Sequence, residues 1–264
     1  MGFVPRYAFS AQRLFVDEPL AGGYRFGLNQ PHANYLLSVL RLRDGAQVLV
    51  FNGRDGEWLA EIGNVSKRKA DLVVLQQLRV QEAGSDLDYC FAPLKHARLD
   101  YMVQKAVEMG ARRLVPVLTK RTQVARVNIS RMRANAIEAA EQCGILAIPE
   151  IASETSLAAY LAQRSPERLI IFCDEGAEVS DPITLLRDAE TKLADNPALA
   201  LLIGPEGGFD AGERETLLAS PNVLPISLGS RILRADTAAV AGLALVQAIL
   251  GDWRTEQRRT TMSP

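Results

Sequence analysis

Residues 198–209 read ALALLIGPEGGF, a continuous apolar run that passes directly into a glycine-rich loop. A short apolar run bounded by glycine and proline predicts a strand buried on both faces, as in a parallel sheet. Glycines after such a strand let the backbone approach a ligand closely, and Glu206 adds a charge at the strand end. A tight strand-to-helix turn can also use glycine and proline, but four such residues around a glutamate exceed what one turn needs. We therefore expect a ligand site in this loop.

Strands and helices alternate on both sides of this run. We expect strands at Tyr89–Pro93, Leu114–Leu118, Leu169–Cys173, Ala198–Ile203 and Val223–Leu228. Helices are expected at Leu99–Met109, Ser130–Cys143, Asp181–Ala194, Asp210–Leu218 and Asp236–Gly251. This alternation predicts an α/β fold with a mostly parallel sheet and helices on both faces. In such sheets, ligands bind at the carboxyl ends of the strands.

The chain before residue 79 has a different pattern. Short strands are expected at Gly23–Leu28, Gln47–Phe51, Glu57–Val65 and Ala70–Leu78, with one helix at His32–Leu40. The turn at residues 52–56, NGRDG, is a strong hairpin signal. Several short strands with one helix predict a small β-barrel. We therefore predict a barrel domain at 1–78, a polar linker at Gln81–Asp88, an α/β domain at 86–254 and a flexible tail at 255–264.

Bulk properties limit the class of protein. The chain has 264 residues, 48% of them hydrophobic, which is enough for one large or two modest globular domains. Three widely spaced cysteines form no pairing pattern, and the first residues lack the apolar run of a signal peptide, so we expect a cytoplasmic protein. The two histidines fall in no metal-binding pattern, so we expect no metal.

The charge distribution leaves the partner open. The formal net charge of −1 does not favour nucleic acid. Residues 109–137, however, contain seven arginines and lysines and no acidic residue. This strip can be a solvated face balanced by acids elsewhere in the fold, or a surface that binds nucleic acid.

A second glycine-bearing loop follows the last expected strand. It reads LGSRILR at residues 228–234, with Ile232 and Leu233 between two arginines. The apolar pair can pack on an adenine ring or belong to the core. Neither loop contains GxGxxG, and GPEGG is not followed by GK[ST], so neither a dinucleotide site nor a P-loop is expected.

Together, LIGPEGGF at 202–209 and LGSRILRADTA at 228–238 resemble the RsmE family. Its members are methyltransferases of the SPOUT class that modify N3 of a uracil in 16S ribosomal RNA. The segments HANYLLSVLRLRDG at 32–45, QKAVEMG at 104–110 and EAAEQCG at 138–144 also resemble motifs of that family. The resemblance covers nearly the whole chain.

The resemblance implies a PUA-like N-terminal barrel that binds RNA and a SPOUT domain with a deep trefoil knot. It also implies S-adenosyl-L-methionine (SAM) as methyl donor, the small ribosomal subunit as substrate and a homodimer. The residues expected to bind SAM are Leu202, Ile203, Gly204, Pro205, Glu206, Gly207, Leu228, Gly229, Ile232, Leu233 and Arg234.

Catalytic and RNA-contacting residues follow from the same resemblance. Arg234 is expected to stabilise negative charge that develops on the uracil oxygens. Glu206 and Glu141 are candidate bases for the N3 proton, with Asp236 as a further candidate. The residues expected to contact RNA are Arg6, Lys95, Arg98 and Arg121.

Two departures from the family pattern keep other functions open. The family usually reads LRTETA where this chain has LRADTA at 233–238, and Ile145 stands where an arginine is common. The alternatives are a ribose 2′-O-methyltransferase of the same class and a non-catalytic RNA-binding or ribosome-assembly protein. An enzyme that uses GPEGG to bind a nucleotide phosphate is a third alternative, and the absence of a P-loop lysine argues against it.

Overall fold

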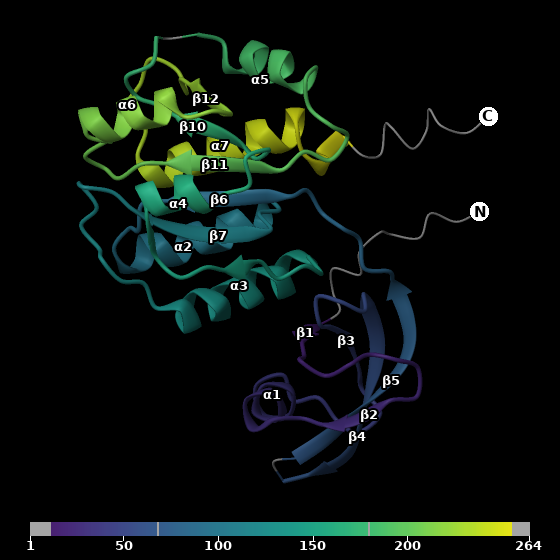
Figure 1. Ribbon diagram of the computed structural model, residues 1–264. Helices are drawn as coiled ribbons and strands as arrows, with labels where there is room; N and C mark the ends of the chain where they lie inside the picture. The colour runs from purple at the N-terminus through teal and green to yellow at the C-terminus, as the bar shows by residue number, and fades with distance from the viewer. Residues whose placement is uncertain (1–11, 68, 179, 255–264) are drawn as a thin grey trace, which may run out of the picture. The chain divides into compact units, whose positions relative to one another are not determined.

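The computed structural model describes residues 12–67, 69–178 and 180–254, which form two compact units (Figure 1). Unit 1 runs to Ala83 and also includes Ala140–Ile148. Unit 2 comprises Gly84–Ala139 and the chain from Pro149 onward. The predicted tail at 255–264 lies outside the described residues.

Unit 1 contains a five-stranded sheet in the order β1-β3-β4-β5-β2. The strands are β1 (Arg13–Phe15), β2 (Arg25–Gly27), β3 (Gln47–Phe51), β4 (Glu57–Ser66) and β5 (Lys69–Arg79). The sequence predicted all of them except β1, which pairs parallel to β3. The predicted helix is present as α1 (Gln30–Asn34), which continues into one π-helical turn, η1 (Tyr35–Val39). Leu36 of this turn is fully buried against the sheet core.

A buried charge cluster, the Glu57 cluster, lies in unit 1. The Glu57 carboxylate accepts hydrogen bonds from Arg13 Nε at 2.9 Å and from Arg79 Nε at 2.8 Å. Arg79 Nη2 also donates to Glu57 Oε1 at 3.1 Å and to the carbonyl of Gly144 at 2.8 Å. A buried carboxylate needs such partners, because an unpaired charge is costly away from water. The cluster therefore joins β1, β4 and β5 through their side chains.

Unit 2 is built on a parallel sheet in the order β12-β10-β11-β6-β7-β8, with β9 paired to β7. Its strands are β6 (Leu87–Phe91), β7 (Arg113–Leu118), β8 (Glu150–Ile151), β9 (Thr155–Ser156), β10 (Leu169–Cys173), β11 (Leu199–Ile203) and β12 (Val223–Ile226). The predicted parallel sheet is confirmed, and β11 lies inside it and is buried along its whole length. The linker prediction was wrong at its end, because Leu87 and Asp88 already belong to β6.

Helices cover both faces of this sheet, as predicted. They are α2 (His96–Glu108), α3 (Ile129–Cys143), α4 (Leu157–Gln163), α5 (Pro182–Glu190), α6 (Ala211–Ala219) and α7 (Ala235–Ile249), followed by a 3₁₀ turn, η2 (Asp252–Arg254). On one face, Leu157 of α4 and Leu217 of α6 pack with Phe172 and Leu202. On the other face, α7 packs on β11 and also contacts α2 and α5. None of the described helices is long and apolar enough to cross a membrane.

One buried polar residue fixes the position of α7. Gln247 is completely buried, and its Nε2 donates to the carbonyl of Met109 at the end of α2 at 2.7 Å. Its Oε1 accepts from the backbone N–H of Asp252 at 3.1 Å. Gly110 has a φ of +76°, and a Cβ there would lie 2.6 Å from Gln247 Nε2. Gly110, which follows α2, is therefore required for two reasons: its backbone conformation and its close approach to the Gln247 side chain.

Candidate active site

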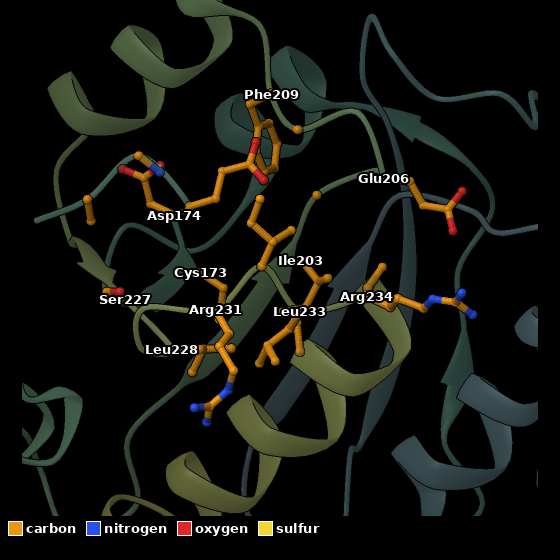
Figure 2. Close-up of a pocket in the computed structure, with 18 of the residues that line it drawn as sticks. Cys173, Asp174, Ile203, Glu206, Phe209, Ser227, Leu228, Arg231, Leu233 and Arg234 are labelled. Carbon is orange, nitrogen blue, oxygen red and sulfur yellow. The ribbon is translucent and has the colours of Figure 1, made fainter. Parts of the chain in front are cut away.

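A cavity of about 440 Å³ lies at the carboxyl ends of β10, β11 and β12 (Figure 2). We call it the strand-end pocket. Three loops line it, at residues 173–177 after β10, 203–209 after β11 and 227–235 after β12. Because parallel strands end at the same edge of a sheet, these loops meet there although they are distant in the sequence. The two loops singled out by their glycines thus share one cavity.

The loop after β12 gives the pocket an apolar side. Leu228, Ile232 and Leu233 line it, and Ala235 and Ala238 of α7 continue the same surface. Ile232 is 93% exposed, which is unusual for a large apolar side chain. A surface of this kind suits a flat ring or another apolar group of a ligand.

The glycines of the loop after β11 make room for side chains of the protein itself. A Cβ at Gly204 would lie 2.4 Å from the ring of Phe209, which packs edge-on against Phe172. Gly208 has a φ of +68°, and a Cβ there would lie 1.9 Å from a carboxylate oxygen of Glu175. Gly204 and Gly208 are therefore needed for the close packing of Phe209 and Glu175, independently of any ligand that the loop binds.

The loop after β10 gives the pocket a polar side, which was not predicted from the sequence. The Asp174 carboxylate is buried and accepts from Arg214 Nε at 2.9 and 3.1 Å and from the backbone of Gly176 at 3.0 Å. Beside it, burial raises the pKa of the Cys173 thiol to about 12, so this thiol stays protonated. The signal was available, because Asp174 directly follows a buried apolar strand in the sequence.

A second group of charges, the Arg98 cluster, joins the pocket loops to α2. Arg98 Nη1 donates to Glu206 Oε1 of the loop after β11, and Arg98 Nε donates to Asp236 Oδ2 at 3.1 Å. Asp236 lies in the first turn of α7. Its hydrogen bond from Arg98 is the main reason that its pKa lies below the ordinary value. Arg98 thus places one cation between two carboxylates that come from different elements.

The segment after β7 holds the loop after β11 from outside the pocket. Arg121 Nη1 donates to the carbonyl of Gly207 at 2.6 Å. Lys120 Nζ pairs with Asp210 at 2.5 Å, and its backbone N–H donates to Glu213 at 2.8 Å. Asp210 and Glu213 also form the capping box that begins α6. These contacts fix where the loop ends and the helix starts.

Most of the residues predicted to bind the cofactor line this cavity. They are Ile203, Gly204, Pro205, Glu206, Leu228, Gly229, Ile232, Leu233 and Arg234. Leu202 instead belongs to the core of the sheet, and Gly207 presents its carbonyl to Arg121. Arg234 is exposed, and its side chain makes no hydrogen bond or ion pair with another described residue. Figure 2 shows Glu206 and Arg234 extending to the same side of the view, away from Cys173, Asp174 and Ser227.

The remaining predicted residues lie in other places. Glu141 belongs to unit 1, where its Oε1 accepts from the backbone N–H of Phe15 at 2.8 Å, and it does not line the pocket. Lys95 is exposed and precedes α2, while Arg98 and Arg121 make the contacts given above. Arg6 lies outside the described residues. Within the described ranges, no three His, Cys, Asp or Glu side chains are placed to hold a metal ion.

Comparison with known protein families gives two matches that together cover most of the chain. The family described as RNA methyltransferase domain matches residues 81–247. The family described as RNA methyltransferase PUA domain matches residues 28–75. The first match contains the whole strand-end pocket, and the second covers α1, η1, β3, β4 and most of β5 in unit 1.

Solved structures share the fold. A ribosomal RNA small subunit methyltransferase E from Neisseria gonorrhoeae, bound to S-adenosyl methionine, superposes with a TM-score of 0.80 at 23% identity, covering 92% of this chain and 99% of that one. A Legionella pneumophila protein described as a methyltransferase, solved with SAM bound, gives a TM-score of 0.77 at 28% identity with the same coverage.

Curated relatives match along most of their length. Ribosomal RNA small subunit methyltransferase E of Rickettsia conorii is 31% identical over 238 residues, covering 90% of this chain and 95% of the relative. The protein of the same name from Synechocystis is 30% identical, covering 84% of this chain and 73% of the relative. The chain therefore belongs to the RNA methyltransferase family that includes ribosomal RNA small subunit methyltransferase E.

Proposed function

We propose that this chain transfers a methyl group from SAM to N3 of a uridine in the 16S RNA of the small ribosomal subunit. The observation that carries this proposal is the strand-end pocket, which is lined by the two loops whose sequences resemble the RsmE family. The names of the curated relatives and the SAM bound in the Legionella pneumophila structure support it.

The residues of the pocket fit SAM. The cavity of about 440 Å³ is in the usual range for a small-molecule site, which is about 300–1,000 Å³. Its apolar side, with Leu228 and Leu233, suits the adenine ring. Its polar side, with Glu175 and the backbone of Gly176, suits hydroxyl and amino groups. When bound, SAM supplies a methyl group on a sulfonium, which is already activated for transfer.

The chain's own residues then have two tasks, which are to orient the uracil and to handle charge. Arg234 lines the pocket with a guanidinium that no described residue engages, so it is available to stabilise negative charge on the uracil oxygens. Of the three candidate bases, Glu206 lines the pocket, whereas Glu141 and Asp236 do not. We therefore assign acceptance of the N3 proton to Glu206.

Four further features belong to this proposal as predictions. Lys95, Arg121 and Arg6 are proposed to contact the RNA backbone, which attracts basic side chains. A homodimer is proposed because the resemblance to the RsmE family implies one. A cytoplasmic location fits the proposed ribosomal substrate. The trefoil knot implied by the resemblance remains a prediction.

The test is methyl transfer from labelled SAM to small ribosomal subunits that lack the modification, with the product nucleoside identified by mass spectrometry. We expect the wild-type protein to produce 3-methyluridine. For Arg234→Ala we expect the rate of methyl transfer to fall about a hundredfold or more, as for removal of one charge-stabilising donor. Arg187→Ala is the matched control, because Arg187 is exposed on α5 and does not line the pocket.

Other outcomes separate the alternatives. Label on a ribose 2′-oxygen would identify the sister activity of the same class. Binding of SAM and RNA without any transfer would point to the non-catalytic protein, and the Ala235-Asp236 departure would then be the first place to look.

A further inference from the structure

We propose that Arg98 is a positioning residue that fastens the loop after β11 to the start of α7, so that the SAM site keeps its shape. This inference rests on the proposed function and replaces the expectation that Arg98 contacts RNA. It concerns a residue outside the pocket lining, because Arg98 itself does not line the cavity.

The three members of the Arg98 cluster come from three separate elements. Arg98 lies in the first turn of α2, Glu206 in the loop after β11 and Asp236 in the first turn of α7. Arg98 donates through Nη1 to Glu206 and through Nε to Asp236 at 3.1 Å. Glu206 lines the pocket, and Asp236 directly follows Ala235, which also lines it. One guanidinium thus connects the loop after β11 with the start of α7.

Each of the three guanidinium nitrogens of Arg98 is either engaged or covered within the fold. Nε and Nη1 are engaged by the two carboxylates. The third, Nη2, is covered by surrounding atoms and has no hydrogen-bond partner in the described part of the chain. A phosphate contact would require an exposed donor, and Lys95 just before α2 has one. The geometry therefore favours an internal role for Arg98 and an external role for Lys95.

Charge explains why a cation is needed at this place. Glu206 and Asp236 carry like charges on two segments that the arginine brings together. Without Arg98, the segments lose their connection at this edge of the pocket, and the two carboxylates have no shared partner. A planar guanidinium can serve two carboxylates through different nitrogens, whereas a lysine ammonium is a single point charge.

The test is SAM binding by isothermal calorimetry, which does not depend on methyl transfer. For Arg98→Ala we expect the Kd for SAM to rise about three- to fivefold, as for the loss of a partly exposed ion pair that holds the site. Arg98→Lys should recover part of this loss, because it restores the charge but not both contacts. The affinity for RNA and its salt dependence should not change.

Lys95→Ala is the matched control, since Lys95 precedes the same helix and is exposed. Here we expect unchanged SAM affinity and a salt slope of RNA binding lowered by about one, as for one lost phosphate contact. A double-mutant cycle of Arg98→Ala with Asp236→Asn should be non-additive in SAM affinity, because the two residues act through one contact. Thermal unfolding of each variant shows whether it folds.

Three outcomes would overturn the inference while leaving the proposed function intact. In the first, Arg98→Ala binds SAM as tightly as the wild-type protein, and its affinity for RNA depends less on salt. In the second, the cycle is additive. In the third, Arg98→Lys is no better than Arg98→Ala although both variants fold. Failure of the unmodified chain to bind SAM at all would instead overturn the proposed function.

Discussion

Unit 1 holds one carboxylate between two arginines, whereas unit 2 holds one arginine between two carboxylates. The side chains of Glu57 and Arg13 are 4% and 5% exposed. Those of Arg98 and Glu206 are 32% and 49% exposed. The two clusters contain the same kinds of group and nearly the same kinds of hydrogen bond, and they differ mainly in burial.

Burial decides what each cluster does for the protein. Removing one partner of a buried ion pair leaves an uncompensated charge, which costs about 3–5 kcal/mol. An exposed pair contributes only about 0–1 kcal/mol, because water and salt screen it. We infer that the Glu57 cluster acts mainly on folding. The Arg98 cluster contributes little to stability and can therefore be specialised for the shape of the pocket.

The largest expected effect is that of Glu57→Ala. Two arginines would then face each other in the interior without a carboxylate, and the free energy of unfolding should fall by about 3–5 kcal/mol. Chemical denaturation followed by circular dichroism measures it. Glu61→Ala, on the same strand but only partly buried, is the control and should cost less than about 1 kcal/mol. Equal losses in the two variants would show that the buried cluster has no special importance.

A smaller effect is expected when one arginine of each cluster is replaced by lysine. Arg79→Lys loses the two-pronged contact with Glu57 and the bond to the Gly144 carbonyl, so stability should fall by about 1.5–3 kcal/mol. Its SAM affinity should not change. Arg98→Lys should show the reverse, with weaker SAM binding and a stability loss below about 1 kcal/mol. If both variants lose stability alike, the distinction between the clusters fails.

The smallest effect concerns acid. Asp236 has a pKa below its ordinary value, mainly because Arg98 donates to it, so its contribution is complete at neutral pH. That contribution is lost as the pH falls through the lowered pKa. The stability difference between the unmodified chain and Asp236→Asn should be at most about 1 kcal/mol at pH 7 and should decrease once the pH falls below about 3.9, the ordinary aspartate value. Denaturation at a series of pH values checks this, and a difference that persists in acid would contradict it.

The sequence predicted the parts of unit 2 that carry a strong local signal. Long apolar runs such as residues 198–203 indicated buried strands, and Asp210 was found as the residue that caps α6. The strands β8 and β9 have two residues each and are too short for any periodic pattern. Leu87 and Asp88 were assigned to the linker because they end the polar stretch that begins at Gln81. Arg168 and Arg113 lie 3.5 and 3.7 Å from that acid and compensate its charge.

The site was predictable only where its residues are close in sequence. The glycines in the sequence identified both main loops of the site, because backbone that packs closely against other atoms requires residues without a side chain. The pairing of Asp174 with Arg214 was missed, since it depends on β10 and β11 being neighbours in the sheet. Likewise, no local feature of the motif at 138–144 reveals that Glu141 groups with unit 1. Distant partners are set by strand order, which a single sequence does not display.

The strand order has a consequence for how the protein is made. β11 lies between β10 and β6, so that Leu199 pairs with Leu87, which is synthesised much earlier. Until β10 and β11 have left the ribosome, one edge of β6 has no neighbour and can associate with other chains. Pairings between such distant segments also make folding slow. The methyl-donor site is therefore completed late in folding, and a newly made chain passes through an aggregation-prone stage before it can bind anything there.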